Sequence, residues 1–395
     1  MTNSQQFFIS ILSDHLNGRK TSARPELDWD ALCACAKIHQ VSGIVYHQCS
    51  AWLPPEYKAQ FSELHAAELF FYYNRESLFK QLSQAFCKAK IPFFSVKGLE
   101  VARLYPVPAM RTMGDCDIVV HAEDREAVHG IMISLGFENT QKNDYEWMYV
   151  KNALLFEIHN QLLYDEAANT EHDRSTVASA WDYASATEQG TRYELDWSFH
   201  FLFLLLHLKK HLIHSGVGFR QFMDIAVVLQ RCELNWEWIN ARLEELELQS
   251  FAGTILALID RWFGAKASIN LPVLEDAFCE DATEKIFTGG IFGFEDENNR
   301  DGAQMRRLAN AKGPIWIARA RYLRQIVFPP YRNIACVPTY AFLEGRPWLL
   351  PAAWIYRMYY TLRYKKKTVD HRIDNTFISD ARLDARKQEL SRWGL

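Results

Sequence analysis

The feature that most constrains the fold is a break in helical periodicity between about residues 90 and 165. Before the break, apolar side chains recur every three, four or seven residues from Leu64 to Phe86, which predicts a long amphipathic helix beginning after Pro54-Pro55. Helical periodicity returns at about Trp181 and continues to the end of the chain. The pattern predicts an α+β fold with three regions: an N-terminal helical region (1–90), a small mixed β-sheet core (91–170) and a large C-terminal helical region (171–395).

Within the central region, short apolar runs alternate with turn signals. Residues 91–96 predict a buried strand followed by a helical turn, and 115–120 predict an alternating strand. A helix is expected from Glu123 to Gly136, because acidic residues suit its start and glycine its end. Residues 146–150 and 153–162 flank Lys151-Asn152 at hairpin spacing. This order indicates a small mixed sheet with helices packed on it.

Composition narrows the class of protein. A chain of 395 residues with 49% hydrophobic residues is globular, and a net charge of −4 provides no general field for nucleic acid. The eight cysteines lie mostly in apolar patterns, which predicts buried thiols in a reducing compartment. Met1 to Leu12 does not resemble a signal peptide, and the apolar run from Phe199 to Leu208 is about half the roughly 20 residues of a membrane span. We therefore expect a soluble cytoplasmic protein.

Asp115 and Asp117 are the first candidate site residues. They are one residue apart on an expected strand, so both side chains point to the same face. Two such carboxylates are costly together unless a cation lies between them, and oxygen ligands favour Mg²⁺ or Mn²⁺. Glu157 shares a face of the later strand with His159 and would complete a three-carboxylate cluster if the two strands are neighbours. The alternative is an ordinary strand end that faces water.

Lys97-Gly98 follows the buried strand and opens a helical turn. Glycine lets the backbone approach a phosphate, a helix N-terminus offers N–H groups, and lysine supplies charge. Arg111 lies in the loop before the aspartates, where it could pair with a phosphate. The alternatives are an ordinary strand-to-helix turn for Lys97-Gly98 and a surface ion pair for Arg111.

Together these residues form a pattern that resembles the uncharacterised nucleotidyltransferase family of bacteria, relatives of the DNA polymerase β-like superfamily. The resemblance covers about residues 30 to 230, and its specific part is the block from Lys97 to Asp117. The matching residues are Lys97-Gly98, Tyr105-Pro106, Arg111, Gly114-Asp115-Cys116-Asp117, Gly136-Phe137 and Glu157-Ile158-His159, with weaker matches at 207–211 and 220–224.

The resemblance implies a nucleotidyltransferase core and a Mg²⁺-dependent (or Mn²⁺-dependent) transfer of a nucleoside monophosphate from an NTP to an acceptor hydroxyl. It implies that Asp115, Asp117 and Glu157 are the catalytic and metal-binding residues. It also implies that Lys97, Gly98, Arg111 and Gly114 bind the nucleotide. The acceptor could be a sugar, a peptide, a protein or an RNA end. Phosphoryl transfer on the same fold, and a non-catalytic scaffold or regulatory protein, are the alternatives.

Two further patterns have both a functional and a structural interpretation. His200, His207, His211 and His214 form one helical stripe, which is either a polar seam between a helix and the sheet, a second metal site or an acceptor-binding face. We regard His159, His207 and His211 as candidate contacts for the acceptor or a phosphate. The aromatic segment 348–364 ends in Lys365-Lys366-Lys367, which is either a weak contact for an anionic surface or a solvated helix end.

Overall fold

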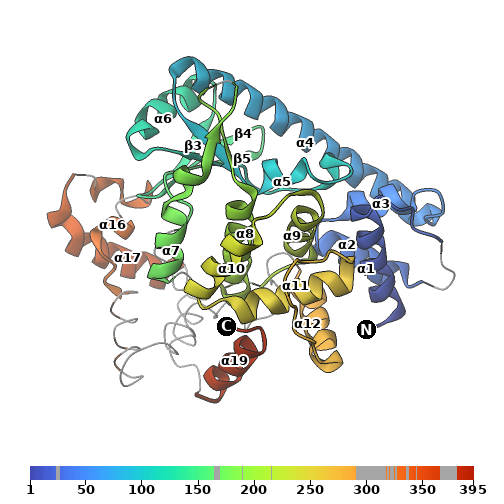
Figure 1. Ribbon diagram of the computed structural model, residues 1–395. Helices are drawn as coiled ribbons and strands as arrows, with labels where there is room; N and C mark the ends of the chain where they lie inside the picture. Colours follow the sequence, from blue (N-terminus) through green and yellow to red (C-terminus); the bar gives the residue numbers. More distant parts are fainter. Residues whose placement is uncertain are drawn as a thin grey trace.

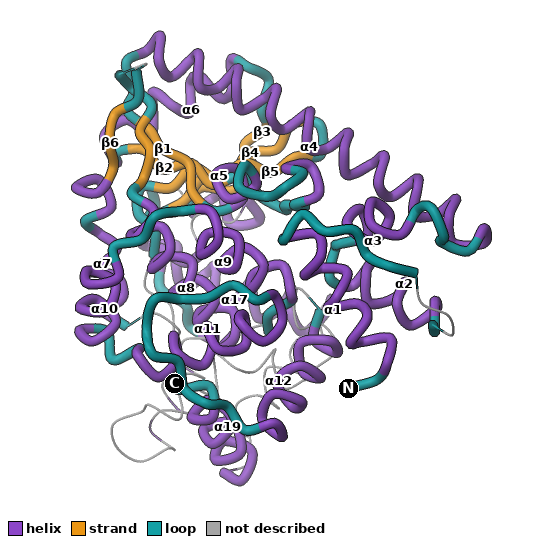
Figure 2. Tube along the Cα trace, turned by 45° about the vertical axis from the view of Figure 1, so that its right-hand side comes forward, coloured by secondary structure: helices purple, strands orange, loops and turns teal. Residues whose placement is uncertain are grey.

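The computed structural model contains a five-stranded mixed sheet between two groups of helices (Figure 1). It confirms the expected α+β fold, with a small sheet core and helical regions on both sides in the sequence. Figures 1 and 2 both show the long helix α4 running along one side of the sheet and the bulk of the helices on the other side. The structure describes residues 1–23, 27–163, 170–188, 190–214, 216–290, 317, 320, 324, 327–334, 338–343, 345–364 and 380–395.

The sheet has the strand order β1-β2-β5-β4-β3. Only β2 and β5 run parallel, and the other neighbouring strands are antiparallel. The strands are β1 (Phe93–Val96), β2 (Asp117–Val120), β3 (Glu138–Lys142), β4 (Glu146–Lys151) and β5 (Leu154–His159).

Helices precede, interrupt and follow the sheet. Those up to the last strand are α1 (Asn3–Leu16), α2 (Trp29–Ile38), α3 (Ser42–Cys49), α4 (Pro55–Ala89), α5 (Gly98–Ala102), the 3-10 turns η1 (Pro108–Met110) and η2 (Ala122–Asp124), and α6 (Arg125–Ser134). Those after it are α7 (Glu171–Ala178), η3 (Ala180–Tyr183), α8 (Trp197–His214), α9 (Phe219–Arg231), α10 (Trp236–Glu245), α11 (Gln249–Phe263), α12 (Asp276–Gly289), α16 (Tyr331–Ile334), η4 (Pro338–Leu343), η5 (Pro347–Leu349), α17 (Leu350–Tyr364) and α19 (Asp380–Arg392).

The sheet separates two hydrophobic cores. On one face, Phe93, Ile118 and Phe156 pack with apolar side chains of α4 and α6. On the other face, Phe94 and Val119 join a larger core. Because successive side chains of a strand alternate between faces, Asp117 shares the face of Val119, opposite to that of Ile118. The carboxylate of β2 is therefore directed to the larger core.

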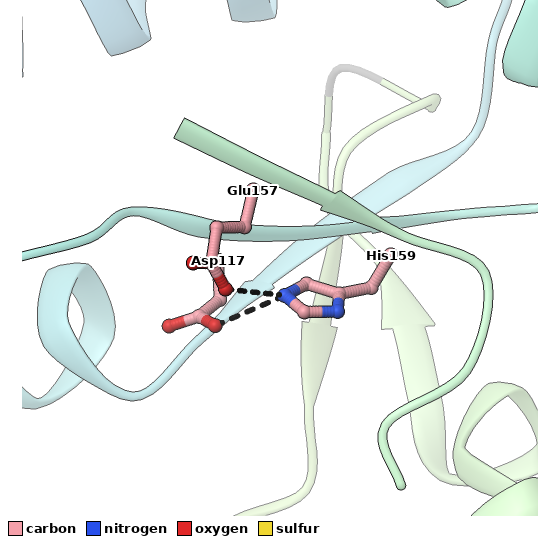
Figure 3. Close-up of side chains that lie close together, drawn as sticks. All are labelled: Asp117, Glu157 and His159. Atoms are coloured by element: carbon pink, nitrogen blue, oxygen red, sulfur yellow. Dashed lines mark hydrogen bonds and ion pairs between the residues drawn. The ribbon is translucent and has the colours of Figure 1, made fainter. Parts of the chain in front are cut away.

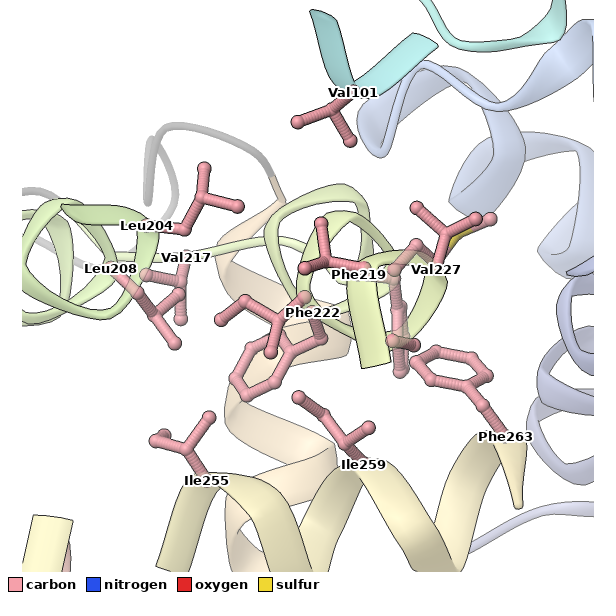
Figure 4. Packing of buried hydrophobic residues seen from close by; sticks show 14 of the residues in the cluster. Val101, Leu204, Leu208, Val217, Phe219, Phe222, Val227, Ile255, Ile259 and Phe263 are labelled. Carbon is pink, nitrogen blue, oxygen red and sulfur yellow. The ribbon is translucent and has the colours of Figure 1, made fainter. Parts of the chain in front are cut away.

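The larger core is formed mainly by helices that lie beneath the sheet in Figure 1. Helix α9 contacts both α8 and α11, and Figure 4 shows Phe222 directed toward Ile255 and Ile259 of α11. The apolar side chains of α8 are buried around the whole helix, so other parts of the chain pack against it on all sides. The packing gives the sheet a rigid wall of helices opposite Asp117.

Several predicted boundaries were wrong in detail. The strand expected from Asp115 begins at Asp117, because β1 pairs with β2 only as far as Val96 opposite Asp117 and then turns away. The hairpin turn is Asn152-Ala153, one residue later than expected, and both residues have positive φ, as a two-residue type I′ turn requires.

Three strands were missed. Strand β3 has a mostly exposed sequence, so it shows no apolar alternation. The small strands β6 (Ala184–Ala186) and β7 (Tyr193–Leu195) form a two-stranded sheet inside the region expected to be helical throughout. Each has only three residues, which is too short for a periodic signal.

Helix α17 carries much of the aromatic segment that the sequence singled out. Trp348 and Ile355 are each 71% exposed, while Ala353 packs in a small separate core with Ile334 and Leu343. Lys365 to Lys367 lie outside the described residues. Among the described helices, none has the length and apolar character that a membrane crossing requires.

Candidate active site

The parallel pair β2 and β5 brings the predicted acidic residues together. Asp117 lies directly opposite Glu157 in the register, and Val119 lies opposite His159. Ile118 and Ile158 point to the core beside α4, so the side chains of Asp117, Glu157 and His159 share the face directed to the helices. The expectation that the two strands are neighbours is therefore confirmed.

One ring nitrogen of His159 faces both carboxylates (Figure 3). Its Nε2 is 3.1 Å from Oδ1 of Asp117 and 3.3 Å from Oε2 of Glu157. Burial alone would lower the pKa of His159, but the hydrogen bonds to Asp117 and Glu157 outweigh it and raise this pKa to about 9. In the metal-free protein the ring is thus held as a cation beside the two acids, and it would lose a proton on coordinating a metal.

Lys97 is a second cation at the same carboxylate. Its Nζ donates to Oδ1 of Asp117 over 2.8 Å, and the Asp117 side chain is almost completely buried. Burial would raise the pKa of Asp117, but Lys97 and His159 hold it well below its usual range. Burial likewise opposes the charge of Lys97, yet the neighbouring acids raise the pKa of this lysine. Lys97 therefore neutralises Asp117 as the structure stands.

Asp115 precedes the strand but belongs to the same electrostatic group. Repulsion from Asp117, followed by burial, raises the pKa of Asp115, and Glu157 adds to the effect. Cys116, between the two aspartates, continues the ladder by donating its N–H to the carbonyl of Leu155. Asp115 thus adds negative charge to the pair formed by Asp117 and Glu157.

The donor set fits a divalent cation. One ligand atom each from Asp117, Glu157 and His159 lie within 4.8 Å of one another. Oδ2 of Asp117 is buried and has no hydrogen-bond partner among the described residues. A buried carboxylate oxygen without a partner is costly, and a metal ion would satisfy it. Carboxylate oxygens suit Mg²⁺, and an imidazole in the set favours Mn²⁺ over Mg²⁺.

Of the two interpretations of Arg111, the structure shows the ion pair, but this pair is buried and does not lie on the surface. Its Nη2 and Nε donate to the two carboxylate oxygens of Asp224 over 2.6 and 3.2 Å. The hydroxyl of Tyr105 donates to the same carboxylate over 2.8 Å. A side chain on Gly98 would bring its Cβ to 2.9 Å from Nη1 of Arg111, so the residue after Lys97 must be small.

The histidine stripe of α8 is split between two settings. His200 is buried, and its Nε2 accepts the backbone N–H of Lys97 over 2.9 Å. His207 and His211 form a pair, with 3.0 Å between their Nε2 atoms. The side chain of His214 lies outside the described residues. His200 therefore supports the Lys97 turn from α8, whereas His207 and His211 are compatible with each interpretation of the stripe.

Seven of the residues singled out from the sequence line one pocket between the sheet and helices α8 and α9. The pocket has a volume of about 120 Å³. Its lining residues are Lys97, Gly98, Arg111, Gly114, Asp115, Leu204, His207, Leu208, His211, Arg220, Gln221 and Asp224. We call it the α8–α9 pocket. His159 belongs to the neighbouring carboxylate cluster and is absent from this lining.

Sequence reasoning assigned no role to three residues of this neighbourhood. Glu146 of β4 lies opposite His159 in the register, and its Oε2 is 3.9 Å from Nδ1 of that ring. Burial, followed by repulsion from Glu157, raises the pKa of Glu146. Arg220 and Asp224 lie more than 100 residues from Arg111 in sequence. Arg220 and Asp224 are four residues apart on one helix, and this spacing was the sequence signal that could have linked the two residues.

The chain matches one protein family over more than half of its length. The sequence model of a family described as "Uncharacterised nucleotidyltransferase" matches residues 25–264, more than half of the chain. The match extends from just before α2 through α11 and includes every candidate site residue. No curated protein matches the chain.

Two solved structures of one enzyme are similar to part of the chain. The solution structure of the antibiotic-resistance factor ANT(2'')-Ia matches at 12% identity and a TM-score of 0.34, over 46% of this chain and 95% of that one. The crystal structure of ANT(2'')-Ia in complex with adenylyl-2''-tobramycin matches at 13% identity and a TM-score of 0.34, over 44% of this chain and 97% of that one.

Proposed function

Because the chain belongs to the uncharacterised nucleotidyltransferase family, we propose that it transfers a nucleoside monophosphate from an NTP to an acceptor hydroxyl in a reaction that depends on a divalent metal. The observation that carries this proposal is the register of β2 and β5, which sets Asp117 opposite Glu157 with Asp115 beside them. Two acids opposite each other on the sheet, with a third just before the strand, suit metal-dependent phosphoryl chemistry.

Asp117 and Glu157 would hold Mg²⁺ or Mn²⁺ together with a nitrogen of His159, and Asp115, which interacts electrostatically with both acids, would complete the acidic set. When bound, the metal supplies positive charge to the phosphate oxygens and to the reacting hydroxyl. The buried oxygen of Asp117 that lacks a partner supports this assignment.

The residues of the chain account for the remaining chemistry. The acceptor hydroxyl oxygen forms a bond to the α-phosphorus, the bond from that phosphorus to the oxygen bridging to the β-phosphate breaks, and pyrophosphate leaves. Glu157 accepts the hydroxyl proton. Lys97 is about one-sixth exposed at its side chain, so its ammonium group can pair with a phosphate while it remains next to Asp117. Gly98 and Gly114 leave room for the phosphates beside the backbone.

The test is incubation of the purified protein with Mg²⁺ or Mn²⁺, cell extract and each NTP labelled at the α-phosphate. Parallel reactions carry the label at the γ-phosphate. Nucleotidyl transfer predicts α-label, but not γ-label, on a sugar, a peptide, a protein or an RNA end. Transfer of γ-label alone would instead identify a phosphotransferase. Absence of both labels from every acceptor, in reactions that contain active extract, would favour a non-catalytic scaffold.

A further inference from the structure

The three cations that line the α8–α9 pocket differ in whether a carboxylate is bound to them. Arg111 is neutralised by Asp224, whose two oxygens accept from that arginine and from Tyr105. Lys97 is neutralised by Asp117. Arg220 is the third cation of the lining; it forms no ion pair with a described carboxylate, although Asp115 and Asp224 line the same pocket.

Arg220 is held by neutral groups. Its Nη1 donates to Oε1 of Gln40 over 3.1 Å, and to the carbonyl and the hydroxyl of Thr112 over 3.1 and 3.2 Å. In the part of the chain that the structure describes, no carboxylate lies within ion-pair distance of this guanidinium. Burial, followed by repulsion from Arg111, lowers the pKa of Arg220 to about 10. A half-buried cation beside another arginine is costly without an anion.

The opposite wall of the pocket offers neutral hydrogen-bonding groups. Burial, followed by repulsion from Lys97, holds the pKa of His207 well below its usual range. Its ring is therefore uncharged, and it shares a hydrogen bond with His211. The first turn of α9, which carries Arg220, contains no acidic residue. The walls thus offer an anion the cation Arg220 and neutral groups, while Asp115 is a carboxylate of the same lining that a bound metal ion would neutralise.

The size of the pocket limits what it can hold. The pocket has a volume of about 120 Å³. Pockets for drug-sized ligands measure about 300–1,000 Å³. The small volume therefore favours a short charged group, such as a phosphate chain, over a ligand of that size.

We propose that the α8–α9 pocket binds the β- and γ-phosphates of the NTP, and that Arg220 is the residue that pairs with them. The inference rests on the proposed nucleotidyl transfer, because it identifies where the leaving pyrophosphate lies. Asp115 lines the same pocket, so phosphates bound there reach the carboxylate cluster. The acceptor hydroxyl then has to approach from outside the pocket.

Inorganic pyrophosphate and tripolyphosphate test the proposal without knowledge of the base. Calorimetry with Mg²⁺ present would measure their affinities for the wild type, Arg220→Gln and Arg220→Lys, with the four NMPs as the comparison. We expect Arg220→Gln to weaken both polyphosphates roughly 10-fold to 100-fold, as for loss of a charged hydrogen bond. Affinity for any NMP that binds should change less than about twofold, and lysine should restore part of the lost affinity.

Arg231→Gln is the matched control, because Arg231 is exposed at the far end of the same helix. Circular dichroism would confirm that each variant is folded, and Arg220→Lys retains the cation if Arg220→Gln unfolds. Equal polyphosphate binding by the wild type and Arg220→Gln would overturn the pocket assignment. The assignment would also be overturned if Arg220→Gln lost equal affinity for NMP and for polyphosphate.

The two proposals can fail separately. If α-label is transferred by the wild type while Arg220→Gln retains polyphosphate affinity, the pocket assignment is wrong and the proposed function stands. If tripolyphosphate binds in an Arg220-dependent way but no label is transferred, the pocket assignment stands and the proposed reaction is wrong.

Discussion

The backbone N–H of Lys97 donates a hydrogen bond to Nε2 of His200 over 2.9 Å, which ties the turn after β1 to helix α8. Lys97 has φ 53° and ψ −118°, a conformation that costs a side-chain-bearing residue about 1–3 kcal/mol. Burial lowers the pKa of His200 to about 4, so the ring is neutral and Nε2 can accept. The ring also stacks on Trp197, with 5.1 Å between the ring centres.

His200→Leu should therefore destabilise the protein by about 1–3 kcal/mol, because it leaves the buried N–H of Lys97 without an acceptor. Turnover should fall as well, since the turn that aims Lys97 at Asp117 loses its support. His200→Gln keeps a polar acceptor and should lose less of both. Urea unfolding and the labelled-NTP assay would measure the two effects. A leucine variant as stable and as active as the wild type would show that the hydrogen bond does not fix the turn.

The buried pair Arg111–Asp224 predicts a large stability effect. Asp224→Asn leaves the Arg111 guanidinium buried with a weakened partner, so the free energy of unfolding should fall by roughly 3–5 kcal/mol. Tyr105→Phe removes one neutral donor to the same carboxylate and should cost about 1 kcal/mol. Urea unfolding of both variants gives the comparison.

Asp276→Asn is the control for this pair, because the ion pair of Asp276 with Arg261 is largely exposed. Its loss should cost at most about 1 kcal/mol. Asp224→Asn would contradict the prediction if it cost no more than this exposed substitution.

Side-chain periodicity explains which parts of the site could be predicted. Asp115 and Asp117 were recognised because two residues separated by one position on a strand share a face. Glu157 was recognised by the same alternation on the later strand, and the parallel register sets it opposite Asp117. Arg220 could not be assigned in this way, because its position depends on how α9 packs against α8. Asp224, the ion-pair partner of Arg111, could not be predicted for the same reason, because it is also on α9.

The fold shows the same division. Helix α4 and strand β1 have continuous apolar patterns and were predicted close to their observed bounds. Strand β3 was missed because its side chains are mostly exposed, so its position depends on pairing with β4 rather than on burial. Pairing of this kind leaves little trace in a single sequence.

Glu68 of α4 predicts a pH dependence of stability. Burial raises the pKa of its carboxyl to about 8, although a hydrogen bond from the backbone of Gly43 partly offsets the effect. One of its oxygens fills the space that a side chain on Gly43 would need. Because the folded pKa lies above the usual value of 4.5, the contribution to stability is fully present below pH 4.5 and is lost as the pH rises through about 8.

Glu68→Gln removes this titration and should therefore be more stable than the wild type at about pH 9, by on the order of 1–3 kcal/mol after allowance for solvent access. At about pH 5 the two proteins should be nearly equal. Thermal unfolding across this range would test the expectation. Glu63→Gln, an exposed change on the same helix, should follow the wild type at every pH. If the stability of Glu68→Gln also followed that of the wild type at every pH, the Glu68 carboxyl would be ionised throughout this range.

Asp117 is the residue at which the structure changes the expectation from sequence. From spacing alone, Asp117→Asn would relieve repulsion with Asp115 and leave stability unchanged or slightly higher. In the structure, however, Lys97 and His159 both bind the Asp117 carboxylate. Removing its charge leaves two buried cations near each other, so the metal-free protein should lose roughly 3–5 kcal/mol. Because the pKa of Asp117 is lowered, this contribution is present above about pH 4 and is lost as the pH falls.

Metal and nucleotide should affect wild type and Asp117→Asn differently. A cation that binds only the folded state raises the unfolding temperature, and this increase should largely disappear in the variant. The increase in the wild type should be larger with Mn²⁺ than with Mg²⁺ at equal concentration, because His159 supplies nitrogen. Turnover should fall by orders of magnitude. Thermal shifts with and without metal and NTP would be compared with Asp182→Asn, an exposed change of the same kind. Equal responses of Asp117→Asn and the wild type would place the metal elsewhere.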